Sequence, residues 1–145
     1  MKRKILLLDD DEAIRQMLGR VLTQEGYVVI LAATGPHALQ LSATAQLDLV
    51  LLDLNLPGQN GWDVFERLTA DKPLLPIVII TARANQLFVA LGAGAGALME
   101  KPLDLPRLLQ TIRDLLNEPT EMRLARLAGK RAEFHYLPPK AEVAK

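Results

Sequence analysis

Residues 49–58 read LVLLDLNLPG, an apolar run that ends at the carboxylate Asp53 and then turns at Pro57 and Gly58. A run without alternating polar residues is typical of a strand that is buried on both faces of a sheet. Similar runs rich in Ile, Val and Leu occupy residues 5–8, 27–31 and 77–80, and a weaker one lies at 97–99. We therefore expect five buried strands, one of which presents Asp53 at its end.

Segments of helical length separate these runs. We expect helices at about 12–24, from 34 onward, and at 62–68, 85–91 and 105–117. Gly26 is placed to stop the first helix, while Thr34 and Pro36 fit the cap and first turn of the second. Strands that alternate with helices predict βαβ units. The expected fold class is α/β, a doubly wound parallel sheet over residues 2–118.

Composition narrows the class of protein further. The chain has 145 residues, half of them hydrophobic, with 17 basic and 17 acidic side chains, which fits one domain and argues against a globally basic nucleic-acid or membrane-surface binder. The absence of cysteine excludes disulfides and cysteine-ligated metals and fits a reducing cytosol. Asp or Pro interrupts every apolar run before it reaches the length of a signal peptide core or membrane span. We expect a cytoplasmic protein without a membrane partner.

A boundary falls at Glu118-Pro119. Beyond it, residues 119–145 carry six basic and three acidic side chains, and residues 120–132 have the pattern of an amphipathic helix. A tail of this length is too short for a core of its own. We expect residues 1–118 to form the domain and the basic tail to dock on it as a helix, bind something else or stay flexible. The tail has no helix-turn-helix pattern, so nucleic acid is not expected as a partner.

Polar residues follow four of the expected strands. They are Asp9, Asp10 and Asp11 after the first, Asp53 and Asn55 after the third, Thr81 and Ala82 after the fourth, and Glu100, Lys101 and Pro102 after the fifth. In an open parallel sheet, sites form beyond the carboxyl ends of the strands. Carboxylates gathered there repel one another unless a cation joins them, and oxygen ligands alone favour a hard ion such as Mg²⁺.

Asp53 is the natural nucleophile of such a site, because carboxylates can be phosphorylated as acyl phosphates. The metal and Lys101 would neutralise the phosphoryl oxygens, and the Thr81 hydroxyl and Ala82 N–H would donate hydrogen bonds to them. Each residue also has a simpler interpretation. Residues 9–11 fit an acidic helix N-terminus, Asp53 a capping turn, Thr81 a strand-end hydroxyl satisfied by backbone, and Lys101 a solvated surface side chain.

Four pieces, in this order, resemble the receiver domain of bacterial two-component response regulators. They are LLLDDD at 6–11, LLDLNLPG at 51–58 with Gly61, IITAR at 79–83, and Lys101-Pro102. The resemblance covers about residues 2–118. It implies a flavodoxin-like (βα)5 fold with five parallel strands in the order 2-1-3-4-5.

The resemblance also implies roles for individual residues. Asp53 would be the phosphoacceptor; Asp10 and Asp53, with Asp9 directly or through water and the backbone carbonyl of Asn55, would hold Mg²⁺. Thr81, Ala82 and Lys101 would contact the phosphoryl group, and the Lys101–Pro102 bond is expected to be cis. Two departures concern the switch region of Thr81, Leu98 and Pro102. The family's usual aromatic residue is Leu98 here, and the segment between Thr81 and Lys101 is short, so an abbreviated fourth helix is expected.

The function implied is that of a stand-alone receiver, not a metabolic enzyme. A histidine kinase or phosphotransfer protein would supply the phosphoryl group, and the face of the fourth helix, fifth strand and fifth helix would bind a downstream partner or a second copy. Leu98 and the short fourth helix leave a second hypothesis open, an interaction module whose binding is largely independent of phosphorylation. A phosphatase would need a carboxylate at position 55, where the sequence has Asn55.

Overall fold

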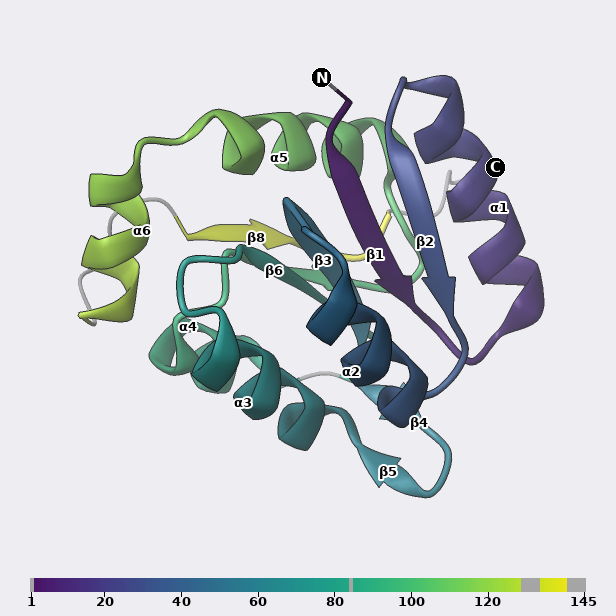
Figure 1. Cartoon of the computed structure of the whole chain (residues 1–145), viewed down its shortest axis with the longest axis horizontal. Coiled ribbons are helices and arrows are strands. Elements are labelled where there is room, and N and C mark those ends of the chain that lie inside the picture. The colour runs from purple at the N-terminus through teal and green to yellow at the C-terminus, as the bar shows by residue number, and fades with distance from the viewer. Residues whose placement is uncertain (1, 84, 129–133, 141–145) are drawn as a thin grey trace, which may run out of the picture.

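A parallel sheet forms the centre of the molecule. The computed structural model describes residues 2–83, 85–128 and 134–140. The sheet contains β1 (Lys4–Leu8), β2 (Val28–Ala32), β3 (Leu49–Asp53), β6 (Ile77–Thr81), β7 (Ala97–Glu100) and β8 (His135–Leu137). Its strand order is β2-β1-β3-β6-β7-β8, and every neighbouring pair is parallel (Figure 1). The first five strands have the order expected of a flavodoxin-like fold, with β6 and β7 as its fourth and fifth strands.

Helices cover both faces of the sheet. On one face lie α1 (Glu12–Gln24) and α5 (Leu105–Asn117), and on the other lie α2 (Gly35–Thr44), α3 (Gly61–Asp71) and α4 (Leu87–Ala93) (Figure 1). Successive side chains of a strand point to opposite faces, so β1 places Leu6 and Leu8 in the core under α2 and α3, and Ile5 and Leu7 in the core under α1 and α5. The unbroken apolar runs thus fill two cores at once.

Local capping sets where the helices begin. The Asp11 carboxylate accepts the Ile14 N–H at 3.2 Å and caps α1, so the simpler interpretation of the acidic cluster holds for this residue. The Thr34 hydroxyl accepts the His37 N–H at 3.3 Å and caps α2, as predicted. The predicted bounds of α1 and α5 are confirmed, whereas α3 is longer than expected and α4 begins two residues later.

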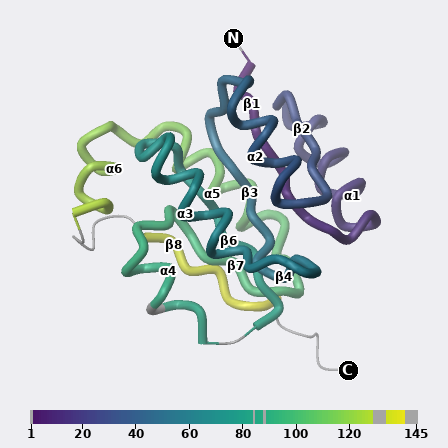
Figure 2. The backbone as a smooth tube through the Cα atoms, turned by 60° about the horizontal axis from the view of Figure 1, so that its bottom comes forward, coloured from purple at the N-terminus to yellow at the C-terminus, as the bar shows by residue number. Residues whose placement is uncertain are grey.

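The prediction of five strands in the parallel sheet falls one short of the six that the structure describes. Residues His135–Leu137 form β8, which adds to the edge of β7 in parallel register, with Leu98 opposite Tyr136 (Figure 2). A three-residue strand has too little periodicity to be read from sequence, and its pairing depends on a free edge that only the folded sheet provides. The structure also contains a small antiparallel hairpin, β4 (Asn55–Leu56) and β5 (Gln59–Asn60), directly after β3.

The helix α6 (Thr120–Leu127) follows α5. Its Arg126 is 4% exposed and forms a two-pronged ion pair with the Glu118 carboxylate, and Arg123 donates to the carbonyls of Leu74 and Leu115. The helix thereby packs against the body. The expected continuation to residue 132 and the basic residues Lys130, Arg131 and Lys145 lie outside the described residues. Across the described ranges, no helix is both long and apolar enough to pass through a membrane.

Candidate functional site

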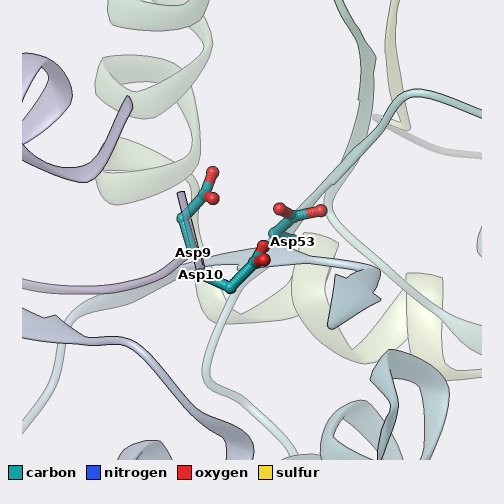
Figure 3. Close-up of side chains that lie close together, drawn as sticks. All are labelled: Asp9, Asp10 and Asp53. Atoms are coloured by element: carbon teal, nitrogen blue, oxygen red, sulfur yellow. The ribbon is translucent and has the colours of Figure 1, made fainter. Parts of the chain in front are cut away.

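Three carboxylates meet at the carboxyl ends of β1 and β3. Oxygen atoms from Asp9, Asp10 and Asp53 all lie within 4.8 Å of one another (Figure 3). Asp9 and Asp53 are 0% and 1% exposed, whereas Asp10 is open to solvent. The structure therefore joins residues that are more than forty positions apart along the chain, as the strand-end argument predicted.

Asp9 carries the strongest electrostatic cost of this cluster. Its Oδ1 accepts the Asp11 N–H at 2.9 Å, but its buried Oδ2 has no hydrogen-bond partner within the described residues. The pKa of Asp9 is raised from 3.8 to about 6: burial is the largest cause and the Asp53 charge also raises the pKa, while the Asp11 N–H and Lys101 lower it. A buried carboxylate oxygen that accepts no hydrogen bond indicates that the site is built to receive a positive group.

Lys101 supplies one such group. Its Nζ lies 3.3 Å from Asp53 Oδ2 and 3.8 Å from Asp9 Oδ2. The Lys101–Pro102 peptide is cis, as expected, and the Lys101 N–H donates to the Thr81 carbonyl at 2.9 Å. Lys101 pairs with two of the three clustered carboxylates, so the site keeps a surplus of negative charge, which a divalent cation would offset.

The loop after β3 fixes the orientation of Asp53. The Asn55 N–H donates to Asp53 Oδ1 at 2.9 Å, which leaves Oδ2 directed at the ammonium of Lys101. Gly58 turns the hairpin at a φ of +66°, a conformation that glycine adopts without strain. At Gly61 a Cβ would lie 2.6 Å from the Leu54 Cα, so only glycine permits this approach. The positive φ at Gly58 and the close approach at Gly61 explain why both positions of the motif hold glycine.

Thr81 and Ala82 occupy the end of β6 beside Asp53. Thr81 is fully buried, and its hydroxyl oxygen accepts the Arg83 N–H at 2.9 Å. Ala82 is exposed in the turn that follows. Because a hydroxyl can accept and donate at once, the Thr81 hydrogen remains available to a group at Asp53. The structure thus places both residues at the same strand ends as the carboxylates.

Of the residues expected in the switch region, Leu98 is part of the hydrophobic core. Leu98 is 0% exposed and belongs to the core under α3 and α4, and Leu87 and Leu91 are partly buried. The side chain of Phe88 lies outside the described residues. α4 has seven residues, as short as the sequence suggested. Among the described side chains of α4, Val89 is a large apolar residue that is 51% exposed.

The donor set fits a magnesium ion. Three carboxylates contribute oxygens that lie within 4.8 Å of one another, and Asp9 has a buried oxygen that accepts no hydrogen bond. Both features match the preference of Mg²⁺ for oxygen ligands and negative charge. The position two residues after Asp53 holds Asn55, whose amide cannot serve as the general acid that a phosphatase would need. The geometry therefore defines a class of protein, a doubly wound α/β domain with an acidic, lysine-capped cation site at its strand ends.

Comparison with known proteins identifies the family. The model of the response regulator receiver domain matches residues 5–113, and the chain belongs to this family. Its members use Mg²⁺ and switch by phosphorylation, and a receiver is a signalling domain rather than a metabolic enzyme. The chain is 40% identical over 128 residues to the DNA-binding response regulator MtrA of Mycobacterium tuberculosis, covering 84% of this chain and 56% of MtrA. It is 39% identical over 122 residues to the response regulator MprA of Mycolicibacterium vanbaalenii, covering 83% of this chain and 53% of MprA.

Solved structures agree with this assignment. A CheY-like receiver domain protein from Methanospirillum hungatei superposes with a TM-score of 0.78 at 32% identity, covering 83% of this chain and 98% of that one. The response regulator TrrA from Thermotoga maritima, solved in complex with Mg²⁺ and BeF, has a TM-score of 0.72 at 28% identity, with 78% and 98% covered.

The chain spans about half the length of the curated relatives that it matches. MtrA is described as DNA-binding, so the relatives do not support the expectation that nucleic acid is no partner, and we do not carry that expectation forward.

Proposed function

We propose that the Asp53 carboxylate accepts a phosphoryl group from a phosphohistidine of a histidine kinase or phosphotransfer protein. The convergence of Asp53 with Lys101, Asp9 and Asp10 at one edge of the sheet carries this proposal. The carboxylate is buried, oriented by a backbone N–H and adjacent to an ammonium, which is the arrangement that phosphoryl transfer requires. We also propose that the domain catalyses its own phosphorylation and dephosphorylation.

The proposed step exchanges one bond at phosphorus for another. An oxygen of Asp53 attacks the phosphorus atom, an O–P bond forms, and the P–N bond to the donor imidazole breaks. The imidazole nitrogen takes the electron pair of that bond and leaves as neutral imidazole, because its other nitrogen already carries a proton. The product on this chain is an aspartyl phosphate, and no further reactant is needed.

The remaining site residues have proposed binding roles. Asp9, Asp10, Asp53 and the backbone carbonyl of Asn55 would hold Mg²⁺, which when bound neutralises charge on the phosphoryl oxygens. Lys101, whose ammonium already faces Asp53 Oδ2, would pair with a phosphoryl oxygen. The Thr81 hydroxyl and the Ala82 N–H would donate hydrogen bonds to the others.

We propose that phosphorylation changes the surface formed by α4, β7 and α5, with Thr81, Leu98 and Pro102 as the switch region. The partner at this surface would be a downstream protein or a second copy of the chain. Leu98 is buried in the core, so the proposed switch proceeds without an aromatic ring at that position.

We also propose residues 1–118 as the receiver domain, residues 119–145 as its appendage, and the cytoplasm as the place of the reaction.

Phosphorylation by a small donor tests the proposal. Incubation with acetyl phosphate and Mg²⁺ is expected to add the mass of one phosphoryl group, in an adduct that base and hydroxylamine remove. Asp53→Asn is expected to lose the adduct, because an amide does not form an acyl phosphate. Asp63→Asn, which changes an exposed carboxylate in the first turn of α3, is the matched control and should keep it. An equally labelled Asp53→Asn protein would contradict the assignment.

A further inference from the structure

The strand β8 pairs with β7, the strand that leads directly to Lys101. It pairs with β7 along Ala97, Leu98 and Met99, and the Lys101 side chain begins two residues beyond the last of these pairs. In Figure 2, β8 runs alongside β7, and the pairing places it at the edge of the sheet. The tail therefore contacts the same strand that carries the lysine to Asp53.

The tail is anchored in the core at this point. Leu137 is 2% exposed and belongs to the core under α1 and α5, next to its register partner Met99. Burying a leucine side chain contributes roughly 1.5–3 kcal/mol. The docking of β8 thus rests on a side chain as well as on backbone hydrogen bonds.

Two further contacts hold the residues on either side of Lys101. The Tyr136 hydroxyl donates to the Glu100 carboxylate, and the Lys140 N–H donates to the Pro102 carbonyl at 2.9 Å. The hydrogen bond to Glu100 raises the pKa of Tyr136 above its ordinary value of 10.0. Residues 100 and 102 are therefore both tied to the tail, while the ammonium between them faces Asp53.

We infer that residues 135–140 are a positioning element of the phosphorylation site, which holds the 100–102 segment so that the Lys101 ammonium reaches the group bound at Asp53. The inference rests on the proposed function. It predicts selectivity, because Mg²⁺ is held by the carboxylates of Asp9, Asp10 and Asp53, whereas a phosphoryl group also needs Lys101. Loss of the tail contacts should weaken phosphoryl binding and spare metal binding.

Coupling of this kind is reciprocal. If docked β8 favours a phosphoryl analogue at Asp53, the bound analogue must favour docked β8 by the same factor. The amide protons of residues 135–137 are therefore expected to exchange more slowly when beryllofluoride and Mg²⁺ are bound. A tail that instead acted as a displaceable cover of β7 would exchange faster under these conditions.

The test uses calorimetry on the full chain to measure two affinities. One is the affinity for Mg²⁺ alone, and the other is the affinity for beryllofluoride at saturating Mg²⁺. Leu137→Asp, which buries a charge in the tail's anchor, is expected to weaken beryllofluoride binding about tenfold, a loss typical of supporting contacts around a site. Tyr136→Phe, which removes only the hydroxyl, is expected to weaken it about threefold. Affinity for Mg²⁺ should stay within twofold. Tyr27→Phe, at the other tyrosine of the chain, is the matched control and should change neither value.

The possible outcomes separate the two proposals. Unchanged beryllofluoride affinity in both tail variants, an equal loss of both affinities, or faster exchange of residues 135–137 on binding would each overturn the positioning role. If Leu137→Asp does not fold, the affinities of Tyr136→Phe and the exchange measurement on the unmodified chain still test the positioning role. A wild-type protein that bound no beryllofluoride would remove the proposed function itself, and this inference with it.

Discussion

Asp9 shows how a single buried carboxylate can lower the stability of the folded protein when no metal is bound. It is fully buried, its Oδ2 has no hydrogen-bond partner within the described residues, and its pKa is raised to about 6, chiefly by burial. The neighbouring charge of Asp53 adds to this cost, and Lys101 offsets part of it. The residue therefore stabilises the site only when a cation is present, which is a common compromise at functional sites.

This cost predicts a pH-dependent stability. The pKa of Asp9 is about 6 in the folded chain, above its ordinary value of 3.8, so the folded state binds the proton more tightly and stability falls as the pH rises from about 4 to about 6. Asp9→Asn should lack this contribution. At pH 7 in a chelator, we expect it to be more stable than wild type by about 1–2 kcal/mol in urea denaturation.

Comparing Asp9→Asn with Asp63→Asn separates the contribution of Asp9 to the pH dependence of stability from the contributions of the other carboxyl groups. Asp63→Asn, which changes an exposed side chain, should follow the wild-type pH profile. Destabilisation of Asp9→Asn at pH 7 without metal would show that its charge is well paired in the folded protein, against this account.

At the scale of elements, α6 is joined to α5 by an ion pair that is removed from solvent. The side chains of Glu118 and Arg126 are 6% and 4% exposed, and Arg123 Nε lies 3.3 Å from the same Glu118 carboxylate. A buried ion pair contributes little compared with an apolar pair of the same shape, but removal of one partner leaves a buried charge. The junction of α5 and α6 therefore depends on both partners being present.

We expect Glu118→Gln to destabilise the docking of α6 by about 3 kcal/mol, because two guanidinium groups lose their carboxylate. The measurement is hydrogen exchange of residues 120–127, supported by urea denaturation of the whole chain. The double variant Glu118→Gln with Arg126→Met should recover part of the loss.

Asp114→Asn provides the matched control, since Asp114 accepts an exposed hydrogen bond from Gln110 on the neighbouring α5. Its effect should stay within about 0.5 kcal/mol. Exchange in α6 that is the same in Glu118→Gln as in wild type would show that other contacts hold this helix.

At the scale of the whole molecule, the sheet gathers acidic side chains at the carboxyl ends of its strands. The site contains three carboxylates and one ammonium, and two of those carboxylates are buried. Any ligand that binds the folded chain and not the unfolded chain stabilises it by mass action. Binding of a divalent cation should therefore appear as a change in global stability.

Mg²⁺ at ten times its dissociation constant is expected to stabilise the fold by about 1.4 kcal/mol and to raise Tm by about 3 °C. Thermal unfolding with increasing MgCl₂, against KCl of equal ionic strength, measures this effect. Asp10→Asn should abolish most of it because the variant loses an exposed ligand without disturbing the core. A Tm shift in Asp10→Asn equal to that of wild type would place the cation elsewhere.

Much of this protein follows from local sequence patterns. The apolar runs predicted β1, β3 and β6 because a strand buried on both faces excludes polar residues, and Thr34 predicted the start of α2 through the cap it provides. The convergence of Asp9, Asp10, Asp53 and Lys101 could also be predicted, since parallel topology brings all strand ends to one edge.

The tertiary structure alone decided where the described part of the tail docks. The strand His135–Leu137 is too short to carry a pattern, and its partner β7 lies almost forty residues earlier in the chain. Contacts between surfaces of the folded chain also produce the buried ion pair of Arg126 and Glu118. They likewise bury the Asp9 oxygen that accepts no hydrogen bond. Sequence determines local periodicity and the chemistry available at strand ends. Burial and long-range pairing emerge only when the whole chain has packed, because they depend on neighbours that are distant along it.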